Sequence, residues 1–382
     1  QRTRTAKIRT TPVRQTRIRT AKNRQTRTRQ TRIRQARIRQ TGTRKARIIR
    51  KTPGKIRSSH YRRRSCTCSG WSWICRYSKK ESSRSGKCES NRATTEADDS
   101  NTVTWQGKNY KYNQNLSNYL LLGVDKRTPA ETRVGKADAG QADALFLLSL
   151  NRKTKEMTLI SIPRDTMTDV ESFDLEGKSL GKSKDHISLS YGYGDGGAES
   201  CKLTQEAVSN LFYGLPIQGY LAMNLDGIPE LAKSVGGLTV TVPNNSLEYK
   251  YPEFSEGAEV TLTEENTEIF VRSRDVDESQ SAIYRMERQK AFLDAFSKRA
   301  KECYEQNAKF AADLFVAIKP YTVTNISEDR LMKLFQTADE GDGYTEWTVP
   351  GEGTQGLSYD EYHVDDDALY TKIMETFYQE VK

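Results

Sequence analysis

Charged side chains stand at the ends of apolar runs in the C-terminal part of this 382-residue chain. Asp125 closes one such run, Asp143 opens the next, and Arg164 with Asp165 follows a third. Side chains at the tips of buried strands leave the core, so these groups can meet in a cleft. Five more arginines and a glutamine complete the set of candidate site residues: Arg127, Arg272, Arg274, Arg285, Arg288 and Gln289.

These residue types suit phosphoryl chemistry. The rigid guanidinium fork of arginine binds phosphate oxygens bidentately, and several forks can hold the spread charge of a pyrophosphate. Two carboxylates facing that ligand would repel it unless a divalent cation lay between them, and Mg2+ prefers carboxylate and phosphate oxygens. We therefore predict that Asp125 and Asp143 hold Mg2+, and that the metal and the arginines neutralise a pyrophosphate leaving group.

Simpler structural roles remain open for the same residues. The segment 272–288 could form a solvated basic face whose arginines pair with neighbouring acids. Asp125 could cap a turn at the end of its strand. His186 could contact a substrate, but packing or capping explains a histidine without a visible partner better.

Hydrophobic periodicity predicts the elements that position these side chains. Apolar runs predict strands at 118–125, 142–150 and 157–162, the last two joined as a hairpin by a polar turn. Further strands are expected at 220–225, 238–242 and 345–349, and helices at 203–212, 227–235, 285–303, 327–338 and 366–381. Because strands and helices alternate, we predict an α/β fold with a central sheet flanked by helices on both faces.

The first hundred residues differ in composition from the rest. They carry 31 Lys and Arg against 5 Asp and Glu, a net charge of +26, whereas residues 101–382 carry 30 against 45, a net charge of −15. An arginine recurs every five residues from Arg4 to Arg44, a period that matches neither helix nor strand. We expect residues 1–100 to be a disordered, low-complexity segment and residues 101–382 to be the folded domain.

Three interpretations of the basic segment stay open. Its arginines could bind the phosphates of a nucleic acid, or it could be a solvated tail. A zinc site is disfavoured because Cys66, Cys68, Cys75 and Cys88 lack paired ligand spacing. Alternatively, the segment is translated from a shifted reading frame. If the reading frame is moved forward by one base, Cys codons become Val or Ala codons and Trp codons become Gly codons. The shifted frame can then encode an apolar span near residues 64–75, which the written sequence lacks.

Several motifs in the folded region resemble those of a LytR-CpsA-Psr domain. In chain order they are Leu-Leu-Gly-Val-Asp125-Lys-Arg127, Ala-Asp143-Ala, Ser-Ile-Pro-Arg164-Asp165-Thr, Tyr191-Gly-Tyr-Gly, Gly236-Gly-Leu-Thr-Val-Thr-Val, Arg272-Ser-Arg274-Asp and Arg285-Met-Glu-Arg288-Gln289. Each is common by itself, and the specific signal is their order over residues 119–300. Residues 301–382 resemble the extension that many members carry.

The resemblance implies an enzyme that moves a glycopolymer, such as teichoic acid or capsule, from a polyprenyl-pyrophosphate carrier to peptidoglycan, with pyrophosphatase as a side activity. It implies that Asp125 and Asp143 bind magnesium, and that an apolar tunnel holds the lipid tail. The residues implied to grip the pyrophosphate are Arg164, Arg272, Arg274, Arg285 and Gln289. On this basis we expect Asp143, Arg164 and Asp165 to be catalytic, and Arg127 and Arg288 to join the substrate-binding residues.

The resemblance also implies a location and leaves one alternative. Members of the family act on the extracytoplasmic face of the membrane, held by a single N-terminal span, and we expect the same location here. Two positions depart from the family pattern: Gln141 stands where many members have arginine, and Ala282 where an acidic residue is frequent. The loss of charge at Gln141 keeps open a non-catalytic regulator that binds polyprenyl phosphates.

Overall fold

The computed structural model describes residues 102–127, 132–174, 176–339 and 344–381, so the predictions for residues 1–100 lie outside the described part. The strands are β1 (Thr102–Trp105), β2 (Lys108–Tyr112), β3 (Leu116–Val124), β4 (Ala142–Asn151), β5 (Met157–Ile162), β6 (Met167–Phe173), β7 (Ser179–His186), β8 (Gly219–Met223), β9 (Leu238–Thr241), β10 (Glu259–Leu262), β11 (Thr322–Thr324), β12 (Tyr344–Thr348), β13 (Gly351–Gln355), β14 (Asp360–Val364) and β15 (Tyr378–Glu380). The helices are α2 (Leu189–Gly192), α3 (Ala198–Leu211), α4 (Gly227–Ser234), α5 (Thr267–Arg272), α6 (Ser281–Gln306), α7 (Phe310–Ile318), α8 (Glu328–Asp339) and α9 (Asp366–Phe377), with short 3-10 turns at Pro252–Phe254 and Lys319–Tyr321.

Six of the strands form a central mixed sheet in the order β11-β8-β3-β4-β5-β12. β8 is parallel to β3, and β12 is parallel to β5. The pairs β3–β4, β4–β5 and β11–β8 are antiparallel. As a result, β3, β5, β8 and β12 all end at the same edge of the sheet, and β4 begins there.

Side chains alternate between two environments along the strands, as the pleat requires. On one face, Leu120 and Leu122 of β3 and Leu145 and Leu147 of β4 belong to a core shared with α3 and α9. The intervening side chains on the opposite face line a cavity instead: Leu121, Phe146, Leu148, Leu159 and Leu221. Both faces of the sheet are therefore apolar, but only one is closely packed.

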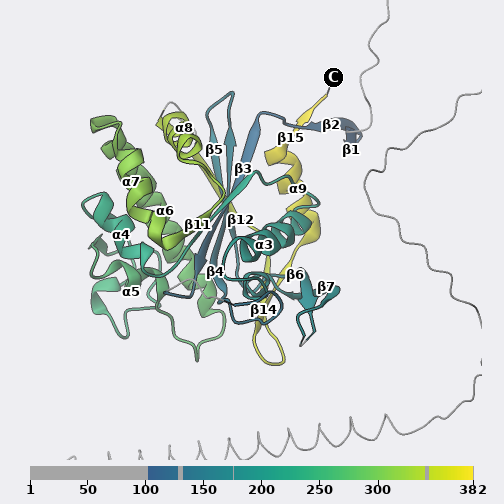
Figure 1. Cartoon of the computed structure of the whole chain (residues 1–382), viewed down its shortest axis with the longest axis horizontal. Helices are drawn as coiled ribbons and strands as arrows, with labels where there is room; N and C mark the ends of the chain where they lie inside the picture. The colour runs from purple at the N-terminus through teal and green to yellow at the C-terminus, as the bar shows by residue number, and fades with distance from the viewer. Residues whose placement is uncertain (1–101, 128–131, 175, 340–343, 382) are drawn as a thin grey trace, which may run out of the picture. The chain divides into compact units, whose positions relative to one another are not determined.

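Helices cover both faces, as the sequence predicts (Figure 1). α3 and α9 lie on the closely packed face, and α4 to α8 gather on the other. The second group has a core of its own, built from α4 to α7 with β9 and β10 around Phe254 and Phe270. The α/β architecture is thus confirmed, with an additional small apolar cluster beneath α6.

Both outer strands of the central sheet come from the C-terminal part of the chain. β11 pairs with β8 on one side, and β12 pairs with β5 on the other. Helix α9 contributes Leu369, Ile373 and Phe377 to the core against the sheet. The region that resembles a family extension is therefore built into the sheet and its core.

The predicted elements differ from the observed ones in a few places. The helix expected over 366–381 ends at Phe377, because Tyr378–Glu380 pairs with β2 as β15. The strand expected at 238–242 is found as β9, but it pairs only with β10 and not with the central sheet. The hairpins β6–β7 and β13–β14 were not predicted, since both are rich in polar residues and glycine.

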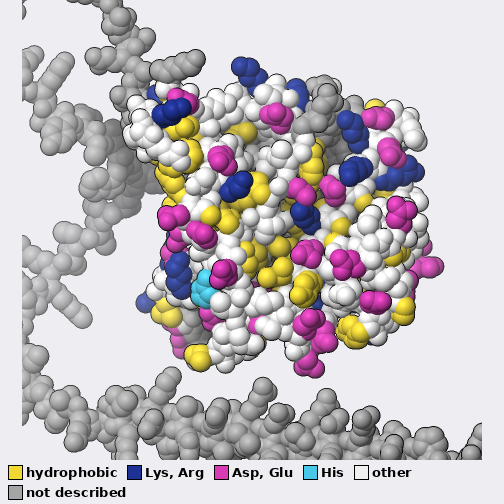
Figure 2. Space-filling view, turned by 180° about the vertical axis from the view of Figure 1, so that it is seen from behind, with side chains coloured by type: hydrophobic (Ala, Val, Ile, Leu, Met, Phe, Trp, Pro, Cys, Tyr) yellow, Lys and Arg dark blue, Asp and Glu magenta, His cyan; other side chains and the backbone are white. Residues whose placement is uncertain are grey.

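The surface of the folded part is acidic rather than basic. On the face shown in Figure 2, acidic side chains are widely spread, and the basic side chains of the described residues do not merge into one patch. Among the helices that the structure describes, none has the length and apolar composition needed to span a bilayer.

Candidate active site

Topology brings the predicted site residues to one edge of the sheet. Asp125 directly follows β3, Asp143 is the second residue of β4, and Arg164 comes two residues after β5. Because β3 and β5 end where β4 begins, these three segments are neighbours. Helix α6 begins beside the same edge and brings Arg285 within its second turn.

A β-bulge sets the position of Asp143. Gly123 pairs with Ala144 and Val124 pairs with Ala142, so Asp143 is the extra residue between two paired positions. Bulges of this kind redirect a side chain and recur beside active sites. Ala142 is fully buried in the core, whereas Asp143 and Ala144 both line the cavity on the other face. The bulge therefore places a carboxylate where regular alternation would not.

Two arginines hold the carboxylate of Asp143 from opposite sides. The Nη1 atom of Arg164 donates to its Oδ1, and the Nη1 atom of Arg285 donates to its Oδ2 at 2.8 Å. Arg164 also donates through Nε to Asp165 Oδ1 at 3.1 Å and through Nη2 to the side-chain oxygen of Gln141. Asp143 thus joins guanidinium groups that come from β5 and from α6.

Asp125 is fixed by the loop that precedes β4. Its Oδ1 atom accepts the backbone N–H of Gln141 at 2.7 Å, and its own N–H donates to the carbonyl of Gln141 at 3.1 Å. Gly140, at φ +95°, allows this approach, since a Cβ there would lie 2.8 Å from Asp125 Oδ1. Gln141 therefore touches both Asp125 and Arg164.

Arg285 is a buried cation with unused hydrogen-bonding capacity. The residue is 4% exposed, and its Nε and Nη2 atoms have no partner among the residues that the structure describes. Burial lowers the pKa of Arg285; Asp143 opposes this, while Arg164 and Arg274 add to it. One carboxylate therefore does not fully compensate the guanidinium, and an anionic ligand would supply what is missing.

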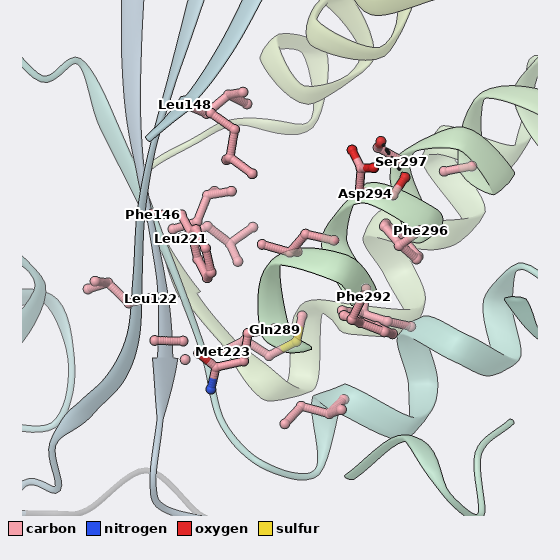
Figure 3. A pocket seen from close by; sticks show the side chains of 18 of the residues that line it. Leu122, Phe146, Leu148, Leu221, Met223, Gln289, Phe292, Asp294, Phe296 and Ser297 are labelled. Atoms are coloured by element: carbon pink, nitrogen blue, oxygen red, sulfur yellow. Dashed lines mark hydrogen bonds between the residues drawn. The ribbon is translucent and has the colours of Figure 1, made fainter. Parts of the chain in front are cut away.

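An apolar cavity of about 510 Å³ runs from this cluster between the sheet and α6. In Figure 3, Phe146 and Leu221 point from the sheet toward α6, with Gln289 near Met223 at one end and Leu148 at the other. Asp143 and Leu150 both line the cavity from β4, and seven residues of strand span roughly 23 Å. The cavity is long enough for an extended hydrocarbon chain.

A second, polar cavity of about 540 Å³ meets the apolar one at the charged cluster. Asp125, Asp143, Arg272 and Arg285 line both cavities. The polar cavity is completed by residues that line it alone: Glu264, Glu265, Glu268, Ile269, Ser273, Arg274 and Val276. The site as a whole suits a molecule with an apolar tail, a doubly charged centre and a polar head.

Two predicted substrate-binding residues lie elsewhere. Arg288 is completely buried and donates to the carbonyls of Phe270 at 2.9 Å and Ser273, and to the side chain of Ser246. Burial, with a smaller effect from Arg285, lowers the pKa of Arg288 to about 10. Arg127 is exposed and pairs with Asp226 at 2.6 Å and Glu268 at 2.7 Å. Neither arginine lines the apolar or the polar cavity described above, and the same holds for Arg164 and Asp165.

The remaining predicted residues are at the cluster. Gln289 lines the apolar cavity, donates to the carbonyl of Val271 at 3.1 Å, and has a buried side-chain oxygen without a partner. Arg272 pairs with Glu268 at 3.2 Å, and Arg274 donates to Ser281 Oγ at 3.1 Å. Glu268 therefore holds Arg272 and Arg127 together, a contact that no motif indicated.

The donor set can be tested against magnesium. Among the described residues, no group of three or more Asp, Glu, His or Cys side chains converges as an all-protein metal site would require. Asp125 and Asp143 both line the two cavities, and Oδ1 of Asp125 is held by the backbone N–H of Gln141. Magnesium is usually bound by one or two carboxylates plus phosphate oxygens and water. Asp125 and Asp143 fit that pattern.

Comparison with known proteins assigns the fold to a family. The family model described as the LytR_cpsA_psr family matches residues 77–376. The chain belongs to the LytR_cpsA_psr family.

Sequence relatives and solved structures agree with this assignment. The protein called polyisoprenyl-teichoic acid–peptidoglycan teichoic acid transferase TagU from Bacillus licheniformis is 28% identical over 255 residues, which is 65% of this chain and 73% of that protein. TagU of Bacillus subtilis is 27% identical over 256 residues, with 65% and 73% covered.

Two solved structures share the LytR_cpsA_psr fold. The structure of TagT bound to LI-WTA has a TM-score of 0.52 and 19% identity, and covers 69% of this chain and 90% of that one. B. subtilis TagV has a TM-score of 0.52 and 23% identity, with 69% and 97% covered. At these identities the structures support the fold alone.

Sequence reasoning missed part of the charged cluster. Gln141 was noted only as a lost charge, but it hydrogen-bonds Arg164 and Asp125. The Oγ atom of Ser188 lies 3.4 Å from Arg164 Nη2 and has no signal in the sequence. The position of Gln141 two residues before Asp143 was the one available clue.

Proposed function

We propose that this chain transfers a glycopolymer from a polyprenyl-pyrophosphate carrier to peptidoglycan. The observation that carries the proposal is the placement of two carboxylates, Asp125 and Asp143, and two arginines, Arg272 and Arg285, where an apolar cavity meets a polar one. A lipid-linked pyrophosphate has the same sequence of parts: apolar tail, charged centre and polar head. The name of the TagU relatives, polyisoprenyl-teichoic acid–peptidoglycan teichoic acid transferase, supports the same class of donor and acceptor.

The tail would lie in the apolar cavity and the pyrophosphate at the arginines. Arg285 offers its Nε and Nη2 atoms, which have no partner among the described residues, whereas Arg164 lines neither cavity and contributes by holding Asp143. Arg272 and Arg274 would hold the oxygens on the side of the polar cavity. Gln289, whose side-chain oxygen is unpartnered, faces the junction from α6.

The reaction forms one P–O bond and breaks another. A hydroxyl oxygen of the acceptor bonds to the phosphorus nearer the polymer, and the bond from that phosphorus to the bridging oxygen breaks. The polyprenyl phosphate leaves with the electron pair, and the hydroxyl proton passes to a carboxylate, for which Asp143 and Asp165 are the candidates. With water in place of the acceptor, the same step is the pyrophosphatase side reaction.

Magnesium belongs to this proposal as the cofactor. Asp125 and Asp143 would hold it, and the ion would neutralise charge on the phosphate oxygens. The role of the chain is then to orient: Gln141 and Gly140 fix Asp125, while Arg164 and Arg285 fix Asp143. Such preorganised charge is usually the largest single contribution to catalysis.

The proposed location is the extracytoplasmic face of the membrane, where a polyprenyl carrier and peptidoglycan meet. An N-terminal span would hold the domain there. Residues 101–382 carry a net charge of −15, which makes them a poor partner for nucleic acid.

The test is transfer from a lipid-linked glycopolymer to peptidoglycan by the full chain in detergent. Asp143→Ala and Arg164→Ala should each lower the rate by roughly 100-fold or more, the scale of losing a charged group that stabilises a transition state. Arg299→Ala is the control for the loss of an arginine elsewhere in the fold, because Arg299 lies on α6, pairs with Glu302 and lines neither cavity. Unchanged transfer and pyrophosphate cleavage in both site variants would instead favour a non-catalytic lipid-binding regulator.

A further inference from the structure

The hairpin β13–β14 touches the segment that carries Arg164. The backbone N–H of Tyr362 donates to the carbonyl of Asp165 at 2.9 Å, and Thr166 forms a parallel bridge with Tyr362. The Tyr362 hydroxyl donates to the carbonyl of Val349 at 2.8 Å and ties the hairpin to the end of β12. One strand of the hairpin is thus fixed against the arginine that binds Asp143 Oδ1.

The same hairpin touches the start of α6, which carries Arg285. Asp360 accepts the backbone N–H of Gln280 through Oδ2 at 2.6 Å and the Ser279 hydroxyl through Oδ1 at 3.0 Å. Gln280 in turn donates from Nε2 to the carbonyl of Thr354 at 3.1 Å. Gln280 is the residue that precedes α6, five positions before Arg285.

The backbone at Gln280 needs these contacts. Its φ is +62°, a left-handed conformation that a residue other than glycine adopts at a cost. The carboxylate of Asp360 supports it from the hairpin, and Gly353 leaves room for it, since a Cβ at Gly353 would collide with the Gln280 amide. Outside support of this kind is what keeps a strained backbone in place.

His186 joins Asp360 to a third element. Its Nε2 atom donates to the carbonyl of Asp360 at 2.8 Å, and its ring meets Tyr359 edge to face. Ser188 lies two residues after the end of β7, and its N–H donates to the carbonyl of Arg164 at 3.2 Å. The Asp360 region therefore connects to the Arg164 segment and to the start of α6 by independent contacts.

We propose that Asp360 is a positioning residue, and that the hairpin β13–β14 sets the spacing between Arg164 and Arg285 on either side of Asp143. Asp360 lines neither cavity, so it acts through the two arginines and not on the substrate. The inference rests on the proposed function for its kinetic readout. The support that Asp360 gives to the start of α6 does not depend on the proposed function.

In the full chain, Asp360→Ala removes the two carboxylate oxygens that accept the Gln280 N–H and the Ser279 hydroxyl. We expect kcat for transfer to fall about 10- to 100-fold, the effect of displacing a reacting group by about 1 Å. KM for the lipid donor should rise by no more than about tenfold, the loss expected for its pyrophosphate, because the apolar cavity is untouched. Amide hydrogen exchange at 278–285 should accelerate, since the start of α6 loses its support.

Two variants separate positioning from a general loss of stability. Asp360→Asn keeps an oxygen that can accept the Gln280 N–H, and should restore most of kcat. Glu352→Ala, an exposed position on the same hairpin, should behave as wild type. Two results would overturn the proposal. One is a kcat for Asp360→Ala within about twofold of wild type. The other is a fall in kcat that accompanies a lower melting temperature and that Asp360→Asn does not reverse.

A second measurement holds even if the wild-type chain shows no transfer. In that case the proposed function fails, and the binding of inorganic pyrophosphate by calorimetry reports on the arginine pair instead. Asp360→Ala should weaken that binding about tenfold, which corresponds to about 1.4 kcal/mol. Equal affinities for the variant and the wild type would refute the positioning role.

Discussion

Replacing Arg285 by methionine should make the ligand-free protein more stable while abolishing its activity. Arg285 is 4% exposed, and its Nε and Nη2 atoms lack partners, so the folded state carries a cost that an apolar side chain of similar length removes. Asp143 would keep its bond to Arg164 in the variant. Stability and function are therefore predicted to move in opposite directions at this residue.

The magnitude follows from the bonds involved. Two buried unpaired donor atoms cost roughly 1–3 kcal/mol each, and loss of the charge-assisted bond to Asp143 costs about 1.5–3 kcal/mol. The central values leave a net gain of about 2 kcal/mol in the free energy of unfolding. For a domain of this size that gain corresponds to a rise in melting temperature of roughly 4 °C.

The assay is calorimetry of the wild type and the variant, with and without inorganic pyrophosphate. Pyrophosphate should raise the melting temperature of the wild type and leave Arg285→Met unchanged, because only the wild type binds it. Arg288→Met is the matched control on the same helix. Arg288 is equally buried but fully hydrogen-bonded, so its loss should destabilise the fold by about 3 kcal/mol or more.

Two results would refute the reasoning on Arg285. One is a variant that unfolds more than about 1 kcal/mol more easily than wild type, which would mean that Arg285 supports the fold. The other is equal stabilisation of both proteins by pyrophosphate, which would mean that the anion binds elsewhere.

Three further predictions concern the metal, the tail cavity and Gln141. Removal of divalent cations with a chelator should abolish activity, and added Mg2+ should restore it. Asp125→Asn should lower activity at saturating Mg2+ by roughly 100-fold, with little change in melting temperature. Full activity in the presence of the chelator would contradict this prediction. Leu121→Trp narrows the apolar cavity and should weaken the binding of polyprenyl pyrophosphate, measured by calorimetry, while leaving inorganic pyrophosphate binding unchanged. Gln141→Leu removes the side-chain oxygen to which Arg164 donates, and it should lower kcat about tenfold. Gln141→Glu keeps an acceptor, so its kcat should fall less. Equal kcat values for the two variants would show that the hydrogen bond to Arg164 has no role in catalysis.

Much of the site could be predicted because the relevant residues sit at the ends of recognisable strands. The apolar runs before Asp125 and Arg164 and after Asp143 gave both the strands and the residues at their tips. The position of Asp143, however, depends on a bulge between β3 and β4. A bulge depends on how two strands pair, so the sequence of either strand alone does not indicate it.

Arg285 and Arg288 show the limit of sequence reasoning most clearly. Both lie on α6, three residues apart, in the same motif. Arg285 and Gln289 face the cavity, whereas Arg288 faces β9 and α5 and bonds their neighbours. The rotation of α6 relative to the sheet decides which arginine meets a ligand, and packing alone determines that rotation.

The placement of β11 and β12 at the two borders of the central sheet constrains how the chain reaches its native state. Until β11 and β12 are available, the open backbones of β8 and β5 remain exposed, and such edges pair readily with other chains. The central sheet is then expected to be completed only after residues 322–348 have been synthesised. Deletions that remove β11 and β12 should produce aggregates and not smaller active forms.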